Sequence, residues 1–485
     1  MNNDSFDVIV MGGGPAGSTV STLVAMQGHN VLLLEREQSP RYQVGESLLP
    51  STIHGICPML GVAKEIQNAN FTYKRGATLR WGKNPDLWHI QFDNSFIKES
   101  AVGYAYQVER TKFDHILLQN ARTKGVNVRE QHRVRELLTE GDRVVGVQVQ
   151  DHEGTTYQAR AKVVVDAAGH SSPHYRQVGE RVYSEFFKNI ALYGYYNGGK
   201  RLPGELEGNI LAAAFEWGWF WYIPLADDLT SVGAVIAQEY AHRLNQQGHE
   251  SVMHECIDAC PIIREYLASA ERITDGLYGE LRIRKDYSYC NTKFWKPGLV
   301  LVGDAACFID PILSSGVHMA TYSALLAARS INSLLRGDFD EERCFAEFEA
   351  RYRNEFAKFY QMLIAFYDTN QHEDSYFWSA RSILNTTERD NSALVTLASG
   401  VSSSELVDGQ LFFDTRGELG STFQMILDEL GKGPPPPEAS AARRVDDIDD
   451  YSGMYCQIPG FENAPLQGTG LVASEDGFYW RESTS

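Results

Sequence analysis

The stretch Asp7-Val8-Ile9-Val10-Met11-Gly12-Gly13-Gly14-Pro15-Ala16-Gly17 lies near the start of the chain, and Val31-Leu32-Leu33-Leu34-Glu35 follows it. This order of apolar and glycine-rich segments predicts a strand, a turn, a helix and a second strand. The glycines at positions 12, 14 and 17 fit G-x-G-x-x-G, the spacing of a dinucleotide-binding turn. In such a turn the helix N-terminus faces a pyrophosphate, and a carboxylate such as Glu35 accepts hydrogen bonds from a ribose hydroxyl. A glycine-rich turn without a ligand is the alternative, and the two flanking strands argue against it.

The chain has 485 residues and a formal net charge of −19 at pH 7. This charge disfavours attraction to nucleic acid or to an anionic membrane, so neither is predicted as a partner. The seven cysteines follow no disulfide framework, which indicates reduced thiols and a cytoplasmic protein. Asp4 and Asp7 stand where a signal peptide would carry basic residues, and no apolar stretch approaches the length of a bilayer span.

Three buried-strand patterns, within 7–35, 163–168 and 298–304, lie far apart in the chain. They predict an α/β protein whose nucleotide-binding domain is assembled from separate segments, with a β-rich second domain inserted between them. A single strand is expected over 71–81, with Lys74 inside it, and a loop over 85–105. The expected division of the chain is a nucleotide-binding domain of residues 1–75, 106–180 and 285–370, a β-rich substrate domain of 76–105 and 181–284, a helical C-terminal cover of 371–432, and a partly disordered linker and tail of 433–485.

Two later segments strengthen the prediction of a nucleotide-binding site that the glycine turn gives. Val165-Asp166-Ala167-Ala168-Gly169, and Gly303-Asp304-Ala305-Ala306 followed by Asp310-Pro311, resemble the FAD-binding signatures of the aromatic hydroxylase superfamily. The resemblance implies the FAD-binding dinucleotide fold of that superfamily. It also implies that the Asp304 carboxylate meets the ribitol chain and that the following helix points its N-terminus at the flavin ring.

Trp219-x-Trp221-x-Ile223-Pro224 resembles the W-x-W-x-I-P signature of flavin-dependent halogenases. Lys74, followed by Gly76, lies where those enzymes carry a catalytic lysine, and the Gly45-Glu46-Ser47 and Ser314-Ser315-Gly316 segments also match. The resemblance covers about residues 5–370. It is closest to the branch that acts on phenolic or related groups held on carrier proteins, as in chloramphenicol-type biosynthesis.

The resemblance implies a set of FAD-binding residues drawn from all these segments: Gly12, Gly14, Pro15, Ala16, Gly17, Glu35, Arg36, Arg41, Glu46, Ser47, Arg110, Asp166, Gly169, Gly303, Asp304, Pro311, Gly316 and Val317. Arg110 is expected on the phosphate or ribityl side of the flavin, with an exposed arginine at a helix start as the alternative. Glu46 lies either on the route between flavin and lysine or in an ordinary structural turn.

The implied reaction uses reduced FAD, dioxygen and chloride or bromide to make hypohalous acid, which passes through the protein to Lys74 and halogenates an aromatic ring. The backbone N–H groups of Ser315 and Gly316, opening a long helix, would hold the halide; ordinary helix capping is the alternative. Lys74 would donate a hydrogen bond to hypohalous acid or, if burial makes it neutral, form a haloamine. A lone lysine in an alternating strand usually faces solvent, and the accompanying motifs argue otherwise.

Alternation predicts that Trp217, Trp219 and Trp221 share one strand face. With Ile223, Trp219 and Trp221 are expected to form a wall that keeps the organic substrate from the flavin; an ordinary aromatic core is the alternative. The sequence His254-x-Cys256-x3-Cys260 has no second ligand pair, so no metal is predicted.

Three other functions stay open at this point: an FAD-dependent aromatic hydroxylase, a flavin reductase of isoprenoid double bonds resembling geranylgeranyl reductases, and a non-catalytic FAD-binding protein. No second G-x-G-x-x-G is evident for a nicotinamide, so a separate flavin reductase is the expected partner. The substrate would be an aromatic small molecule or a carrier-tethered tyrosyl or pyrrolyl group. Docking of an acidic carrier would need a basic patch, for which Arg282, Arg284 and Lys285, or Arg351, Arg353 and Lys358, are the candidates.

Overall fold

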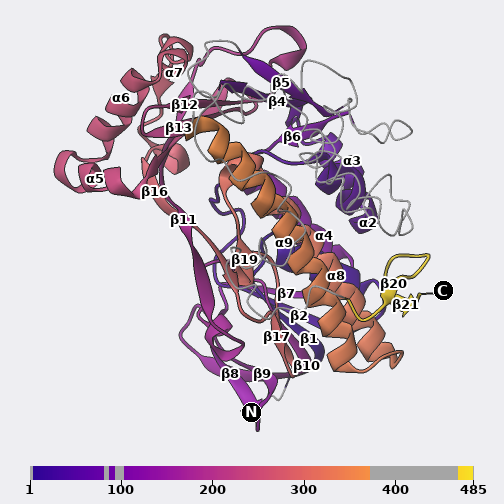
Figure 1. Cartoon of the computed structure of the whole chain (residues 1–485). Helices are drawn as coiled ribbons and strands as arrows, with labels where there is room; N and C mark the ends of the chain where they lie inside the picture. The colour runs from indigo at the N-terminus through magenta and orange to yellow at the C-terminus, as the bar shows by residue number, and fades with distance from the viewer. Residues whose placement is uncertain (1–3, 81–86, 93–102, 372–467, 484–485) are drawn as a thin grey trace, which may run out of the picture.

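The computed structural model describes residues 4–80, 87–92, 103–371 and 468–483, and Figure 1 traces their path. Two large sheets form the body of this part of the chain. The predicted C-terminal cover of 371–432 and linker lie almost wholly outside the described residues. The division into domains therefore stays a prediction.

The first sheet has the strand order β17-β18-β10-β1-β2-β7, with β9 and β8 continuing from β10. Its parallel registers align Val10 with Leu33 and with Val165, and Val165 in turn with Val300. The predicted strands from three distant segments are thus neighbours, and their carboxyl ends meet at one edge. The strands are β1 Asp4–Met11, β2 Val31–Glu35, β7 Asn127–Glu130, β8 Arg133–Glu140, β9 Arg143–Gln150, β10 Thr156–Asp166, β17 Trp295–Lys296 and β18 Leu299–Leu301.

The second sheet has the order β19-β16-β11-β14-β13-β12-β4-β5, with β15 beside β11. One of its faces carries a separate apolar core with helices α5 to α7, including Leu192, Phe220 and Val252. The strands are β4 Gly76–Arg80, β5 Trp88–Gln91, β11 Arg181–Asn197, β12 Ile210–Phe215, β13 Gly218–Pro224, β14 Leu229–Ala237, β15 Glu271–Arg272, β16 Arg282–Asn291 and β19 Cys307–Phe308. The helices are α5 His242–Gln247, α6 His249–Ala259 and α7 Pro261–Tyr266.

Helix α1 (Pro15–Ala25) packs against α8 (Gly316–Arg336) and α4 (Arg110–Thr123), and α8 packs against α9 (Glu341–Gln371). Figure 1 shows α8 and α9 side by side, with the hairpin of β20 (Leu471–Ala473) and β21 (Trp480–Glu482) next to α8. Trp480 anchors this hairpin: it is 1% exposed, and its indole N–H donates to Ser330 Oγ at 2.9 Å. The end of the predicted tail is therefore folded onto the helical layer. The short helices α2 and α3 span Cys57–Leu60 and Ala63–Gln67.

The strand predicted over 71–81 is wrong as a single element, because the chain changes sheets at Arg75. Residues Thr72–Lys74 form β3, which pairs with β6 (Ala105–Gln107), whereas β4 begins at Gly76. A Cβ atom on Gly76 would lie 1.8 Å from the carbonyl oxygen of Ile90, so only glycine allows β4 and β5 to approach this closely. The prediction of a loop over 85–105 is also wrong, because this range contains β5 and the first residue of β6.

The shared face predicted for three tryptophans is also wrong. Trp217 lies in the turn between β12 and β13, before the strand alternation begins. It packs on the α5–α7 side, 5.0 Å from Phe215 and 5.4 Å from Tyr240 between ring centroids. Trp219 and Trp221 belong to the other core, so the turn separates Trp217 from them.

We predict that Gly17→Ala destabilises the fold. A Cβ atom there would lie 1.9 Å from the Gly12 carbonyl oxygen, so α1 would have to move off β1. Overpacking of this kind costs about 1–3 kcal/mol of unfolding free energy, measurable by urea denaturation. Gly316→Ala is the matched control, because its Cβ would meet no atom within 4 Å. Equal stability of Gly17→Ala and the wild type would contradict the close approach.

Candidate active site

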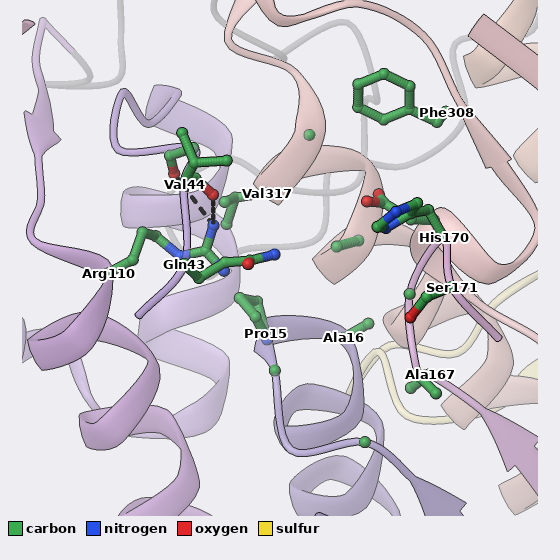
Figure 2. A pocket seen from close by; sticks show the side chains of 18 of the residues that line it. Pro15, Ala16, Gln43, Val44, Arg110, Ala167, His170, Ser171, Phe308 and Val317 are labelled. Carbon is green, nitrogen blue, oxygen red and sulfur yellow. Dashed lines mark hydrogen bonds between the residues drawn. The ribbon is translucent and has the colours of Figure 1, made fainter. Parts of the chain in front are cut away.

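A cavity of about 590 Å³ lies where the carboxyl ends of the first sheet meet the second sheet. Its wall is formed by the glycine turn, residues 41–47, the loop 167–174, strands β11 to β13 and residues 304–320. Figure 2 shows Pro15 and Ala16 at the end of α1 facing this space, with His170 and Phe308 on the opposite side. The cavity thus joins segments that lie as much as 300 residues apart.

The α1 end of the cavity fits a pyrophosphate. Gly14 is the N-cap of α1 and no side chain caps the helix, so its first N–H groups are left for a ligand. A Cβ atom on Gly14 would meet only Arg41 Nη2, at 3.3 Å, which leaves room for a phosphate to approach the backbone. Gly12 and Gly17 serve packing instead, because a Cβ on either would clash with the Ala167 or Gly12 carbonyl oxygen.

Glu35 lies at the end of β2, where the ribose of a dinucleotide is expected. It is 5% exposed, and its carboxylate accepts hydrogen bonds from Gly13 N at 2.6 Å and Glu37 N at 3.0 Å. Arg41 lies 3.8 Å from Glu35 and 3.7 Å from Asp114, and Arg36 and Arg41 both line the cavity. The carboxylate is therefore held in a fixed orientation beside the guanidinium group of Arg41.

Arg110 begins α4 and is buried at 7% exposure, so the alternative of an exposed arginine at a helix start is wrong. Its Nε and Nη2 donate to Asp114 at 2.7 and 2.9 Å, and its Nη1 donates to Val44 O at 2.8 Å. Figure 2 shows the bonds from Nη1 to the carbonyl oxygens of Val44 and Gly45 beside the cavity. Arg110 thus binds Asp114 within α4 and holds the backbone of residues 44–45 in place.

The two later signatures contribute unequally to the cavity wall. Gly169 and Asp304 line it, whereas Gly17, Asp166 and Gly303 do not. Asp166 is fully buried, accepts hydrogen bonds from Ser172 Oγ and Ala168 N, and has a pKa raised by that burial. The Asp166 side chain therefore closes the loop after β10 through these hydrogen bonds. The Asp304 carboxylate lies 3.5 Å from Arg284 at the cavity edge.

Residues before α8 form a second helix N-terminus in the cavity wall, with Pro311, Ser315, Gly316 and Val317 all lining it. Ser314 has a positive φ of 56°, and Ser315 is the N-cap without a side-chain hydrogen bond. A Cβ atom on Gly316 would meet nothing within 4 Å, so this helix start has open space in front of it. Such an N-terminus is suited to an anion or to a negatively charged flavin ring.

A buried hydrogen-bond network fixes the start of α8. The His318 ring is hydrogen-bonded through Nδ1 to Ser51 Oγ at 2.9 Å and through Nε2 to Glu355 Oε1 at 2.8 Å. All three residues are at most 1% exposed. The network joins the first turn of α8 to α9 and to the helical turn Ser51–Ile56. No sequence spacing pointed to it, since its members lie 267 and 37 positions apart.

Of the predicted wall residues, Trp221 and Ile223 line the cavity, whereas Trp219 is buried and does not line it. The Trp221 indole N–H donates to Ser231 Oγ at 3.2 Å, and the centroids of Trp219 and Trp221 are 6.3 Å apart. The buried Trp221 ring therefore forms part of this side of the cavity, next to the Trp219 ring.

Lys74 is 2% exposed and lies outside the cavity lining, so the solvent-facing alternative for this lysine is wrong. Its ammonium group donates to the Leu48 carbonyl oxygen at 2.9 Å and lies 5.3 Å from the centre of the Phe92 ring. Burial lowers the pKa of Lys74 to about 7. The lysine can therefore exchange its proton near neutral pH.

Segment 46–48 connects the cavity to Lys74. Glu46 and Ser47 line the cavity, while Leu48 supplies the carbonyl oxygen that Lys74 binds. Glu46 is 2% exposed, accepts a hydrogen bond from Tyr195 Oη at 2.5 Å, and has a pKa raised by burial to about 7. Tyr195 was not anticipated, because nothing in an aromatic strand 149 positions away marks it as a partner of Glu46.

Among the described residues, no group of three or more His, Cys, Asp and Glu side chains is arranged to hold a metal ion. His254 is exposed and bonds the Glu250 carbonyl, whereas Cys256 is fully buried. A search of the described helices finds none with the length and apolar character of a membrane span.

Comparison with known proteins agrees with this geometry. The tryptophan halogenase family pattern matches residues 7–100 and 94–419. A tryptophan 2-halogenase of Chondromyces crocatus is 34% identical over 408 residues, covering 82% of this chain and 76% of its own length. The flavin-dependent halogenase armH1 of Armillaria mellea is 29% identical, covering 97% of this chain and 90% of its own.

The solved structure of the myxobacterial chondrochloren halogenase CndH, described as a variant of FAD-dependent halogenases, is 51% identical. It superposes with a TM-score of 0.76 and covers 99% of this chain and 100% of its own. A large cavity, two helix N-termini that face it and a buried lysine are all in place, and FAD and a halide are the cofactors of these enzymes. The chain belongs to the tryptophan halogenase family of flavin-dependent halogenases.

Proposed function

We propose that this halogenase passes hypohalous acid from the FAD cavity to Lys74, which directs it onto an electron-rich aromatic ring. The observation that supports the proposal is that one short segment of the chain borders both the cavity and the lysine. Glu46 and Ser47 line the cavity, and the carbonyl two residues after Glu46 binds the Lys74 ammonium group at 2.9 Å. Family membership argues against the hydroxylase, isoprenoid reductase and non-catalytic alternatives.

FAD supplies the electrons with which dioxygen and a halide are converted to hypohalous acid, and a separate flavin reductase provides it in reduced form. The N-terminus of α1 and Glu35 would hold its phosphate and ribose, with Asp304 beside its ribityl chain. The N–H groups of Ser315 and Gly316 would hold the halide. Trp221 and Ile223 would keep the organic substrate out of the cavity while a molecule as small as hypohalous acid passes.

Lys74 has two ways to hold the halogen. As an ammonium group it donates a hydrogen bond to hypohalous acid, which makes the halogen more electrophilic. As a neutral amine it forms a haloamine, in which an N–halogen bond replaces an N–H bond and water leaves. A pKa near 7 makes both forms available at neutral pH.

The substrate ring is proposed to be a phenol or a pyrrole, because electrophilic halogen attacks electron-rich rings. Most side chains of the two basic clusters considered for carrier docking are already engaged within the protein. Arg353 is fully buried on Glu349, and Arg351 and Lys358 pair with Glu347 and Glu355. Arg284 pairs with Asp304 and Arg282 stacks on Tyr42, whereas Lys285 is exposed. Free and carrier-tethered tyrosyl and pyrrolyl substrates should therefore be assayed side by side.

Lys74→Met should abolish halogenation while leaving FAD binding intact. Removal of a group that polarises the reagent costs about 100-fold or more in rate. Mass spectrometry of reactions with a flavin reductase, NADH, oxygen and chloride or bromide measures the loss. Lys64→Met, at an exposed lysine of α3, is the matched control. Halogenation by Lys74→Met at the wild-type rate would refute the assigned role of Lys74.

The same variant should be more stable than the wild type. Burial disfavours the Lys74 cation, so between pH ~7 and ~10.5 the unfolded chain binds more protons than the folded one. The penalty is complete below pH ~7 and vanishes above ~10.5. Lys74→Met should gain roughly 1–4 kcal/mol of unfolding free energy at neutral pH, shrinking as pH rises. Urea denaturation at several pH values measures this, and a pH-independent difference would contradict the buried cation.

Gly316→Ala should weaken halide binding without harming the fold. The added methyl group fills the open space before α8, and its Cβ meets no atom within 4 Å. Loss of one charge-assisted N–H contact costs about 1.5–3 kcal/mol, a rise in halide Kd of roughly 10-fold or more. Calorimetric titration of the FAD-loaded protein with bromide and chloride, beside thermal denaturation, separates the two effects. An unchanged halide Kd would place the halide elsewhere.

A further inference from the structure

Three side chains form a continuous hydrogen-bonded chain along one wall of the cavity. The hydroxyl groups of Tyr42 and Tyr195 are 2.9 Å apart, and Tyr195 donates to Glu46 Oε1 at 2.5 Å. Tyr42 is partly exposed, while Tyr195 and Glu46 are 0% and 2% exposed. The chain therefore runs from a partly exposed tyrosine, which also lines the cavity, to a buried carboxyl group.

The buried end of this chain lies in the cavity wall. Glu46 lines it, and its second oxygen, Oε2, has no hydrogen bond of ordinary geometry within the described part of the protein. A buried carboxyl oxygen without a partner is costly unless it serves a ligand or a reaction. A carboxyl group that borders the cavity and accepts a hydrogen bond from a chain of hydroxyl groups can pass a proton.

The reaction in the cavity has a demand for protons. Reduced flavin (FADH⁻), dioxygen, a halide ion and two protons yield oxidised flavin, hypohalous acid and water. Halogenation of the ring by hypohalous acid then releases water and consumes no net proton. Each turnover therefore draws two protons into a cavity whose wall is mostly buried. This inference rests on the proposed production of hypohalous acid.

We propose that Tyr42, Tyr195 and Glu46 form a proton relay that supplies this demand. Glu46 gives its proton to the cavity from its carboxyl group. Tyr195 reprotonates Glu46 Oε1 as it takes a proton from the Tyr42 hydroxyl, and Tyr42 is reprotonated by water. Each hydroxyl receives a proton as it loses one, so no tyrosinate accumulates. Two cycles of the relay supply the two protons that one turnover consumes.

The surroundings of the relay are consistent with this task. Burial raises the pKa of Glu46 to about 7, opposed by the hydroxyl groups of Tyr195 and Ser231 and by the Arg110 cation, and assisted by the Glu109 charge. An acid with a pKa near the working pH is the most effective proton donor. Burial and the Glu46 charge raise the pKa of Tyr195 well above its ordinary value, which keeps the tyrosine protonated at rest. Arg282 stacks on the Tyr42 ring at 3.9 Å.

The test uses Glu46→Gln, Tyr195→Phe and Tyr42→Phe. Tyr278→Phe is the matched control, because the Tyr278 ring packs 4.4 Å from that of Tyr195 but its hydroxyl donates to Glu109 instead. All four are made in the Lys74→Met background, where position 74 cannot titrate and no substrate is halogenated. Proton uptake after mixing with reduced FAD, oxygen and bromide is followed with an indicator dye, and hypobromous acid with a diffusible scavenger.

We expect proton uptake to slow by about 10- to 100-fold in the three relay variants and not in Tyr278→Phe. The solvent deuterium isotope effect should rise in the same three. The parent's uptake rate should fall as pH rises through about 7, where Glu46 loses its proton, and Glu46→Gln should lack that bend. Added formate should partly restore the rate of Glu46→Gln, which it would not do for a variant with a purely structural defect.

An infrared titration of the protein without FAD gives an independent measurement. A carboxylic acid band that titrates near pH ~7 should be present in the parent and absent from Glu46→Gln. Unchanged uptake rates in the relay variants, or equal slowing in Tyr278→Phe, would overturn the relay. Absence of halide-dependent oxidant would overturn the proposed function instead, and the infrared result does not depend on that outcome.

Discussion

The backbone pairing of segment 46–48 with β6 is the constraint on which the site depends. Leu48 N donates to Tyr106 O at 3.0 Å, and Val108 N donates to Glu46 O at 2.8 Å. Because β6 also pairs with β3, the same ribbon holds Glu46 in the cavity wall and Lys74 beside Leu48. The two ends of the proposed reaction path are thus fixed by main-chain hydrogen bonds, which do not depend on side-chain rotamers. A side-chain contact alone would leave the distance between them free to vary.

The cavity is defined by two helix N-termini, and each is held by a different kind of force. The start of α1 follows from close packing, since the glycines at positions 12 and 17 let helix and strands approach within a distance that any Cβ would prevent. The start of α8 is held by the polar network through His318. The members of this network are almost fully buried, and they join three elements. Buried polar networks of this kind hold a unique arrangement only when every member has its partner.

The sequence predicted what local patterns determine. Apolar runs and glycine spacing located β1, α1, β2, β10 and β18, and their parallel registers bring the three FAD signatures to one sheet edge. It failed where tertiary approach overrides a local pattern. The break at Arg75 depends on Ile90 coming within contact of Gly76, and the position of Trp217 depends on where a turn ends. The link between Tyr195 and Glu46 has no local signal, because a buried tyrosine in an aromatic strand looks like core until its hydroxyl partner is known.

Burial raises the pKa of Glu46 and lowers the pKa of Lys74. That the two groups do not form an ion pair matters as much as their burial. A direct ion pair between them would lower the pKa of the carboxyl group and raise that of the amine, so that both would stay charged at neutral pH. The pKa of Lys74 is shifted by burial, and the charges that act on Glu46 are those of Arg110 and Glu109. Each group is therefore left able to gain or lose a proton near pH ~7. One short ribbon can hold a titratable acid in the cavity wall and a titratable amine beside Leu48 only if the two do not neutralise each other.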